Sequence, residues 1–182
     1  MTAKAPTSLV GAAGEHYCMT QLLLRGCLAA LTPRGSPDAD ILVRSPDGAI
    51  AAEVQVKARS GRRGKGWWMS VKHQDLIRPR LFYCFVDFGH ETSWPVYIMP
   101  SEVVARYLTL SYQEWRVAPG RGGKEHTDWS GRFISPRRPV KGDSDQWMEP
   151  YLGRWDLIIG AASDDRGDAP ATGLISTQMP GV

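Results

Sequence analysis

The chain has 182 residues and a mass of 20.1 kDa, which suits one domain with a single hydrophobic core and gives little reason for two. Hydrophobic residues make up 42% of the chain and charged residues 23%, a balance that excludes a disordered or fibrous protein. The net charge of +3 and the pI of about 8.8 favour a polyanionic partner only weakly.

The chain carries no sign of a membrane or secretory segment. No apolar run approaches the roughly 20 residues that cross a bilayer, and the N-terminus lacks the apolar core of a signal peptide. We therefore expect a cytoplasmic protein without a membrane partner. The three cysteines, Cys18, Cys27 and Cys84, are far apart in apolar surroundings, which predicts reduced thiols in the core.

The first predicted element is a helix over residues 8–25, with Gly26 as its C-terminal stop. Its predicted buried face follows helical spacing with one polar exception, at Val10, Ala13, Tyr17, Gln21 and Leu24. Glu15 falls on a flank with Met19 and Leu22, at the edge of a buried face. That is an unusual place for a carboxylate.

Strands follow the helix. Residues 27–31 predict a short strand, and residues 32–38, with two prolines and a glycine, predict a turn. Residues 40–43 and 49–58 predict an antiparallel hairpin, because Ser-Pro-Asp-Gly at 45–48 has the Pro and Gly placement of a tight turn. Residues across this hairpin should be close neighbours.

The rest of the chain predicts further alternating elements. They are a loop at 60–66, strands at 67–71, 81–88 and 95–99, short helical structure at 73–78, a helix at 101–115 with Ser101 as N-cap, an irregular excursion at 117–141 and a partly helical segment at 145–159. The strand at 81–88 is apolar on both faces and should lie inside a sheet. We predict one domain over residues 1–160 and a disordered tail over 161–182.

The predicted hairpin gathers polar side chains. Glu53, Gln55 and Lys57 alternate with valines, so they project from one face of their strand while the valines enter the core. Asp40 begins the facing strand, and its carboxylate comes near Gln55 and Lys57 if the turn sets the register. A pocket for a metal ion is geometrically feasible there.

This set of side chains suits phosphodiester hydrolysis. Mg²⁺ is commonly held by one or two carboxylates plus water, and it can activate a water and neutralise charge on a phosphate. Asp40 is the first predicted ligand. Lys57 would orient the attacking water or stabilise the transition state, and Glu15 would bind the metal through a water or take a second ion.

Three motifs resemble the PD-(D/E)XK nuclease superfamily. They are Gly14-Glu15 on the first helix, Pro37-Asp38-Ala39-Asp40 before a strand, and Gln55-Val56-Lys57 on the next strand. Archaeal-type Holliday junction resolvases, many restriction endonucleases and several homing endonucleases share this fold. The resemblance implies a restriction endonuclease-like α/β fold, three layers α/β/α with a central mixed sheet, and cleavage of DNA that depends on Mg²⁺ or Mn²⁺. It also allows a homodimer in which each subunit cuts one strand.

The chain departs from the superfamily pattern at one position. Gln55 stands where an Asp or Glu is usual, and a neutral amide is a poorer metal ligand, although some members carry a Gln-x-Lys step. Glu53, on the same strand face, could take over the ligand role. Asp38 and Asp40 both remain candidates, and Asp40 is preferred because it directly precedes the apolar strand.

Cationic residues next to this site predict contacts with DNA phosphates. They are Arg59, Arg62, Arg63 and Lys65. Trp67 and Trp68 could stack on bases, but they fall on alternate faces of a strand, so at least one should pack in the core. His73, His90 and His126 are too scattered to predict a ligand set.

Two other functions are compatible with the same residues. One is a nucleic-acid-binding or protein-interaction module of this fold that has lost cleavage, with Gln55 marking a degenerate site. The other is a toxin-related or protein-interaction domain that does not bind nucleic acid, which the small net charge allows.

Overall fold

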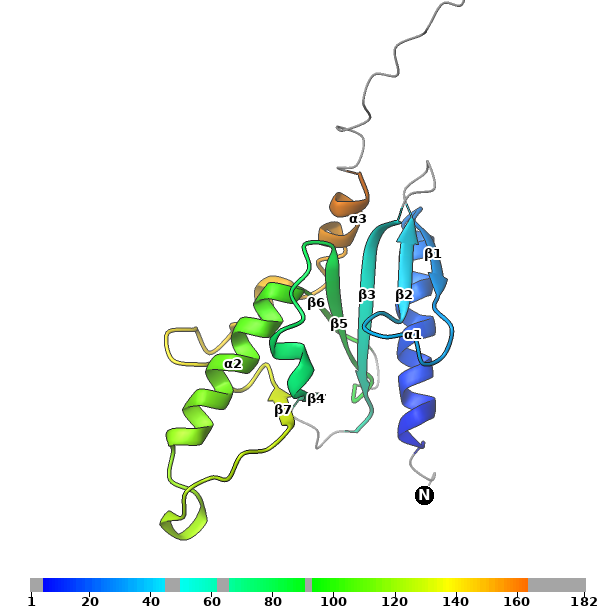
Figure 1. The fold of residues 1–182 in the computed structure, drawn as a ribbon. Helices are drawn as coiled ribbons and strands as arrows, with labels where there is room; N and C mark the ends of the chain where they lie inside the picture. The colour runs from blue at the N-terminus through cyan, green and yellow to red at the C-terminus, as the bar shows by residue number, and fades with distance from the viewer. Residues whose placement is uncertain (1–4, 45–49, 62–65, 91–92, 164–182) are drawn as a thin grey trace, which may run out of the picture.

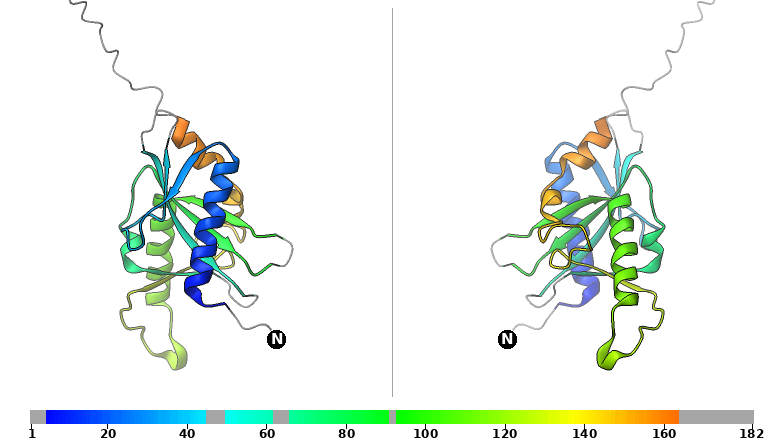
Figure 2. Two further views of the ribbon diagram at one scale, coloured as in Figure 1. Left: turned by 90° about the vertical axis from the view of Figure 1, so that its right-hand side faces the viewer. Right: turned by 90° about the vertical axis from the view of Figure 1, so that its left-hand side faces the viewer.

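The fold is a three-layer α/β/α arrangement, seen in a computed structural model that describes residues 5–44, 50–61, 66–90 and 93–163. A five-stranded sheet has the order β1-β2-β3-β5-β6, and its members are β1 (Leu28–Leu31), β2 (Ile41–Arg44), β3 (Ile50–Arg59), β5 (Leu81–Asp87) and β6 (Val96–Pro100). Only the β3–β5 pair is parallel, so the sheet is mixed. Figures 1 and 2 show helix α1 on one face and helix α2 on the other. This confirms the predicted fold class.

Helix α1 (Thr7–Leu24) confirms the first predicted helix but buries a different face. Its buried residues are spaced four apart, at Val10, Gly14, Cys18 and Leu22. The prediction that Ala13 and Leu24 are buried is wrong, since both are exposed. Gly14 explains the rotation: a Cβ there would lie 2.5 Å from Ala58 Cβ, so the absent side chain lets α1 lie directly on β3.

The β2–β3 hairpin is antiparallel, as predicted, with Ile41 opposite Val54. Strict alternation then separates two faces of β3. Val54 and Val56 are buried under α1, in the same cluster as Cys18 and Leu22. Gln55 faces the opposite layer. The predicted turn at 45–48 lies outside the described residues.

Strand β5 is buried on both faces, as predicted for an interior strand. Phe82 and Cys84 pack in the α1 layer, together with Ile158 of helix α3 (Asp156–Ser163). Tyr83 and Phe85 pack in the other layer, where helix α2 (Ser101–Val117) closes the core. The sheet therefore separates two apolar cores.

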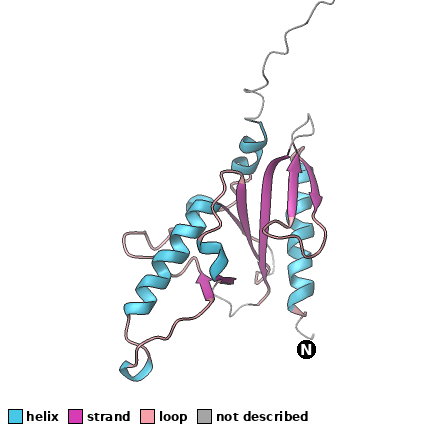
Figure 3. Cartoon of the chain, viewed as in Figure 1, coloured by secondary structure: helices cyan, strands magenta, loops and turns pink. Residues whose placement is uncertain are grey.

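A second, two-stranded sheet lies beside α2 and was only half predicted. Strand β4 (Trp67–Ser70) matches the expected strand, but it pairs with β7 (Gly131–Ile134), which lies inside the stretch predicted to be irregular (Figure 3). Along the chain, β4 is followed by the 3₁₀ helix η1 (Val71–Gln74), which is shorter and earlier than the helix predicted at 73–78.

The structure also bears on several smaller predictions. Ser101 does not cap α2 with its side chain; its hydroxyl instead bonds both backbone groups of Arg78. The predicted domain end at residue 160 falls within α3, so the prediction of a disordered tail is wrong for residues 161–163, which are helical. Residues 164–182 of the predicted tail lie outside the described residues. The three cysteines are free thiols. Within the described ranges, no helix is long and apolar enough to span a bilayer.

Candidate functional site

The candidate site lies at the end of the β2–β3 ladder, where β3 continues without β2 as a partner. The last ladder pair is Ile41 with Val54, and β3 continues beyond it for five residues. The Asp40 carboxylate fills the open edge: its Oδ2 accepts the backbone N–H of Val56 at 2.7 Å and the side-chain amide of Gln55. The side chain thus satisfies a donor that a longer β2 would have paired.

Gln55 and Lys57 continue along the same face of β3. Gln55 is 7% exposed, and its amide donates to Asp40, so the two side chains predicted to meet across the hairpin are in direct contact. Lys57 is half-buried, and burial lowers the pKa of its ammonium while the charge of Asp40 opposes that fall. The fixed charge of Lys57 therefore lies close to the Asp40 carboxylate.

Glu15 reaches the same place from α1. Burial raises the pKa of its carboxyl, and repulsion from Asp40 raises that pKa further, whereas Lys57 opposes the rise. Glu15 and Asp40 also share the wall of a groove of about 570 Å³ that runs between the first turns of α1 and residues 31–36. The structure thus brings Gln55 and Lys57 close to Glu15 and Asp40, and the latter two line the groove.

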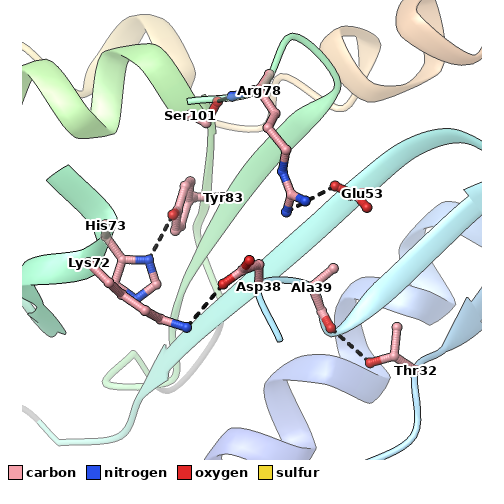
Figure 4. Close-up of polar contacts among 9 residues, drawn as sticks. All are labelled: Thr32, Asp38, Ala39, Glu53, Lys72, His73, Arg78, Tyr83 and Ser101. Carbon is pink, nitrogen blue, oxygen red and sulfur yellow. Dashed lines mark hydrogen bonds and ion pairs between the residues drawn. The ribbon is translucent and has the colours of Figure 1, made fainter. Parts of the chain in front are cut away.

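Asp38 takes a different direction from Asp40. It is the one described non-glycine residue with positive φ, at 68°, and its Oδ1 lies 3.1 Å from Lys72 Nζ (Figure 4). The Thr32 hydroxyl donates to the Ala39 carbonyl at 2.8 Å and fixes the turn between the two aspartates. Of the two candidates, only Asp40 contacts Gln55.

Beside Lys57, the α2 side of the sheet carries a buried polar pair that the sequence did not predict. His73 Nδ1 and the Tyr83 hydroxyl lie 2.8 Å apart (Figure 4). Burial, together with the charges of Lys57 and Lys72, lowers the pKa of His73 to about 4. Burial raises the pKa of Tyr83. No motif in the sequence links these residues: His73 lies in η1, and Tyr83 lies on β5 opposite Gln55 of β3.

Glu53 lies on the same face of β3 as Gln55 but is engaged with a different partner. Its Oε2 forms an ion pair with Arg78 at 3.1 Å, and Arg78 is in turn fixed through its backbone by Ser101 (Figure 4). The ion pair with Arg78 gives no support to the expectation that Glu53 could replace Gln55 as a metal ligand.

Of the four cationic residues predicted to bind phosphate, the structure describes only Arg59. Its guanidinium forms a largely buried ion pair with Asp87 and lies 4.8 Å from the ring centroid of Trp67. Arg59 is therefore engaged within the protein. Arg62, Arg63 and Lys65 lie outside the described residues. Trp67 is buried and Trp68 exposed, which confirms that one tryptophan packs in the core.

The donor set at the site fits a hard divalent cation. Two carboxylates, Glu15 and Asp40, lie close enough to repel each other, and a cation between such groups relieves that repulsion. The amide oxygen of Gln55 is a further oxygen donor beside Asp40. No cluster of three His, Cys, Asp or Glu side chains occurs among the described residues, so water would supply the remaining ligands of Mg²⁺.

Comparison with known proteins gives a match among solved structures. No protein-family model matches the chain, and no curated protein does. Among solved structures, the fold is similar to that of the bacterial homing endonuclease I-Ssp6803I, with a TM-score of 0.53 and 15% sequence identity over 91% of this chain and 100% of that chain. At this identity the likeness concerns the fold, which is a nuclease-like α/β fold.

Proposed function

We propose that this chain is a metal-dependent DNA endonuclease with a PD-(D/E)XK-type site formed by Glu15, Asp40, Gln55 and Lys57. One observation carries the proposal. The Asp40 carboxylate lies at the point where β2 and β3 part, bonded to Gln55 and to the Val56 N–H. Glu15 and Lys57 lie near enough to shift each other's pKa. The fold likeness to a homing endonuclease supports a nuclease in general and DNA as its partner.

Asp40 and Glu15 would hold Mg²⁺ or Mn²⁺, with the Gln55 amide oxygen as a weaker ligand. When bound, such an ion lowers the pKa of a coordinated water and neutralises charge on the scissile phosphate. The Val56 N–H and the Gln55 amide keep the Asp40 carboxylate in one orientation. An oriented carboxylate needs no rearrangement when the ion binds.

Lys57 acts through its charge and its burial. Burial removes water from the ammonium and lowers its pKa, so its attraction for a phosphate oxygen or a developing negative charge is less screened. Asp40 and Glu15 oppose the loss of its proton. Lys57 would thus hold the attacking water or the phosphate next to the carboxylates.

The test is cleavage of supercoiled, linear, branched and single-stranded DNA with Mg²⁺ or Mn²⁺, with EDTA as a control. Lys57→Met should abolish cutting and leave the fold intact, because the aliphatic stem is kept. Lys124→Met removes an exposed lysine elsewhere on the chain and should cut as the parent does. Equal cutting by parent and Lys57→Met would reject this site.

A second function is favoured by Gln55. An amide occupies the usual acidic position and uses its N–H on Asp40, as in a site that has lost a ligand. In that case the chain would bind DNA without cutting it. Its affinity would then fall with salt and would not respond to Mg²⁺, whereas an active site predicts metal-dependent affinity that Asp40→Asn removes.

A further inference from the structure

A second cavity lies between α2 and the two-stranded sheet, away from the residues of the candidate site. Its volume is about 430 Å³, within the range of small-molecule sites. Six aromatic side chains contribute to its lining, and they are Trp68, Tyr107, Tyr112, Trp115, Trp129 and Phe133. So dense an aromatic lining on one surface is a feature that the proposed cleavage does not use.

Two of these rings are presented to solvent. Trp68 is 64% exposed and Trp129 51% exposed, and their ring centroids lie 5.3 Å apart at an interplanar angle of 73°. Trp68 also packs on Phe133, with a centroid distance of 4.7 Å. Pairing of β4 with β7 holds Trp68 opposite Phe133, so the rings sit on a strand pair. Adjacent exposed rings on a fixed support are typical of a binding surface.

The wall of the cavity is rigid on the Arg132 side. Arg132 is buried, donates to Gln74 Oε1 at 2.8 Å and to the backbone carbonyl of Gly131, and lies 3.5 Å from the centroid of Tyr112. Its guanidinium supports the aromatic lining. A site with this support would bind without first reorganising.

The charge around the cavity is positive. Arg138 lies at its edge, 5.5 Å from the Phe133 centroid, and its guanidinium has no carboxylate partner within the described ranges. The carboxylate of Glu114, also in the lining, accepts the backbone N–H of Lys141. Residues 116–141 contain seven Lys or Arg against two Asp or Glu. This charge disfavours a cationic ligand and favours a phosphate beside the rings.

We propose that this cavity binds an unstacked base of a single DNA strand, with the base against Trp68 and Trp129 and the adjacent phosphate near Arg138. Every base offers a π face, so such a site is tolerant of sequence. Strand β4 leads directly into η1, which carries Lys72 and His73 beside Lys57. A strand held at the cavity would therefore approach the site at Asp40. Binding here does not require that Asp40 support cleavage.

The test compares two labelled 12-nucleotide DNA strands of equal charge, oligothymidine and a fully abasic strand. Fluorescence anisotropy gives the dissociation constants at fixed salt in EDTA, so cleavage plays no part. The Trp68→Ala/Trp129→Ala double variant should bind oligothymidine roughly tenfold or more weakly than the parent, and the abasic strand equally well. Trp94→Ala removes another half-exposed tryptophan, which packs on Tyr17 and Phe88, and should not change either constant.

A Trp68→Phe/Trp129→Phe variant keeps a ring at both positions and should restore most of the lost affinity, which separates stacking from misfolding. The proposal is overturned if the alanine double variant binds oligothymidine like the parent, or if the parent does not distinguish oligothymidine from the abasic strand. It is equally overturned if a proline-rich peptide binds the parent more tightly than oligothymidine, since that assigns the rings to a protein partner. Absence of cleavage activity would leave the binding result unchanged.

Discussion

The Asp40 carboxylate accepts the backbone N–H of Val56, with 2.7 Å between Oδ2 and N, just beyond the last ladder pair of β2 and β3. One side chain thus completes the hydrogen bonding of the sheet and presents a carboxylate to the groove. Structural and proposed chemical roles are combined in Asp40, and they can be separated by the choice of substitution.

Asp40→Ala should lower the free energy of unfolding by about 1 to 3 kcal/mol, because it leaves the Val56 N–H without its acceptor. Asp40→Asn keeps an acceptor oxygen and should lower that free energy by less than about 1 kcal/mol. Urea denaturation without metal measures both. Equal losses in the two variants would show that the hydrogen bond is not what Asp40 contributes to stability.

Glu15→Gln should slightly stabilise the metal-free protein at neutral pH. Burial and Asp40 raise the pKa of Glu15 in the folded state, so its ionised form opposes folding, and stability is lost as pH rises through that pKa. The midpoint temperature of thermal denaturation, measured between pH 4 and 8 for the parent and the variant, reports this loss of stability. Adding Mg²⁺ should raise the midpoint temperature of the parent more than that of the variant; the same rise in both would remove Glu15 from the metal site.

The hairpin and its polar face could be predicted because they depend on local order. Alternation along β3 and an antiparallel hairpin are enough to bring Asp40 near Gln55, and the structure places them in contact. The exact register also depends on an irregularity between Val43 and Arg44. The spacing of Glu15 also predicted its position at the edge of a buried face. Each of these inferences uses residues that are close in sequence or joined by one turn.

What could not be predicted depends on contacts between distant segments. The face that α1 buries is set by the close approach of Gly14 to Ala58, which no periodicity reveals. Strand β7 has only four residues, too few to show a strand pattern in the sequence, and its partner β4 lies more than 60 residues earlier. Asp38 and Asp40 are alike in sequence, and the positive φ of Asp38 turns it towards Lys72.

His73 should make stability depend on pH between about 4 and 6.5. Its pKa falls to about 4 in the folded protein, so below 6.5 the unfolded chain takes up a proton that the folded protein does not. Stability should decline as pH falls through this window, by at most about 3 kcal/mol, and level off below it. Urea denaturation across the window measures the decline. His73→Gln should flatten it, with the exposed His16→Gln as control; equal flattening by both variants would show that another group is responsible.

Gly14→Ala should destabilise the protein by about 1 to 3 kcal/mol, because the new methyl group would lie 2.5 Å from Ala58 Cβ and push α1 away from β3. Gly11→Ala, one turn earlier with no atom within 4 Å of its Cβ position, should be stabilising by up to about 1 kcal/mol, since alanine favours helix. Thermal or urea denaturation compares the pair. Since Glu15 follows Gly14 directly, Gly14→Ala should also weaken the Mg²⁺-induced stabilisation, and Gly11→Ala should not. Destabilisation of the same size in both variants would mean that the contact between Gly14 and β3 does not position α1.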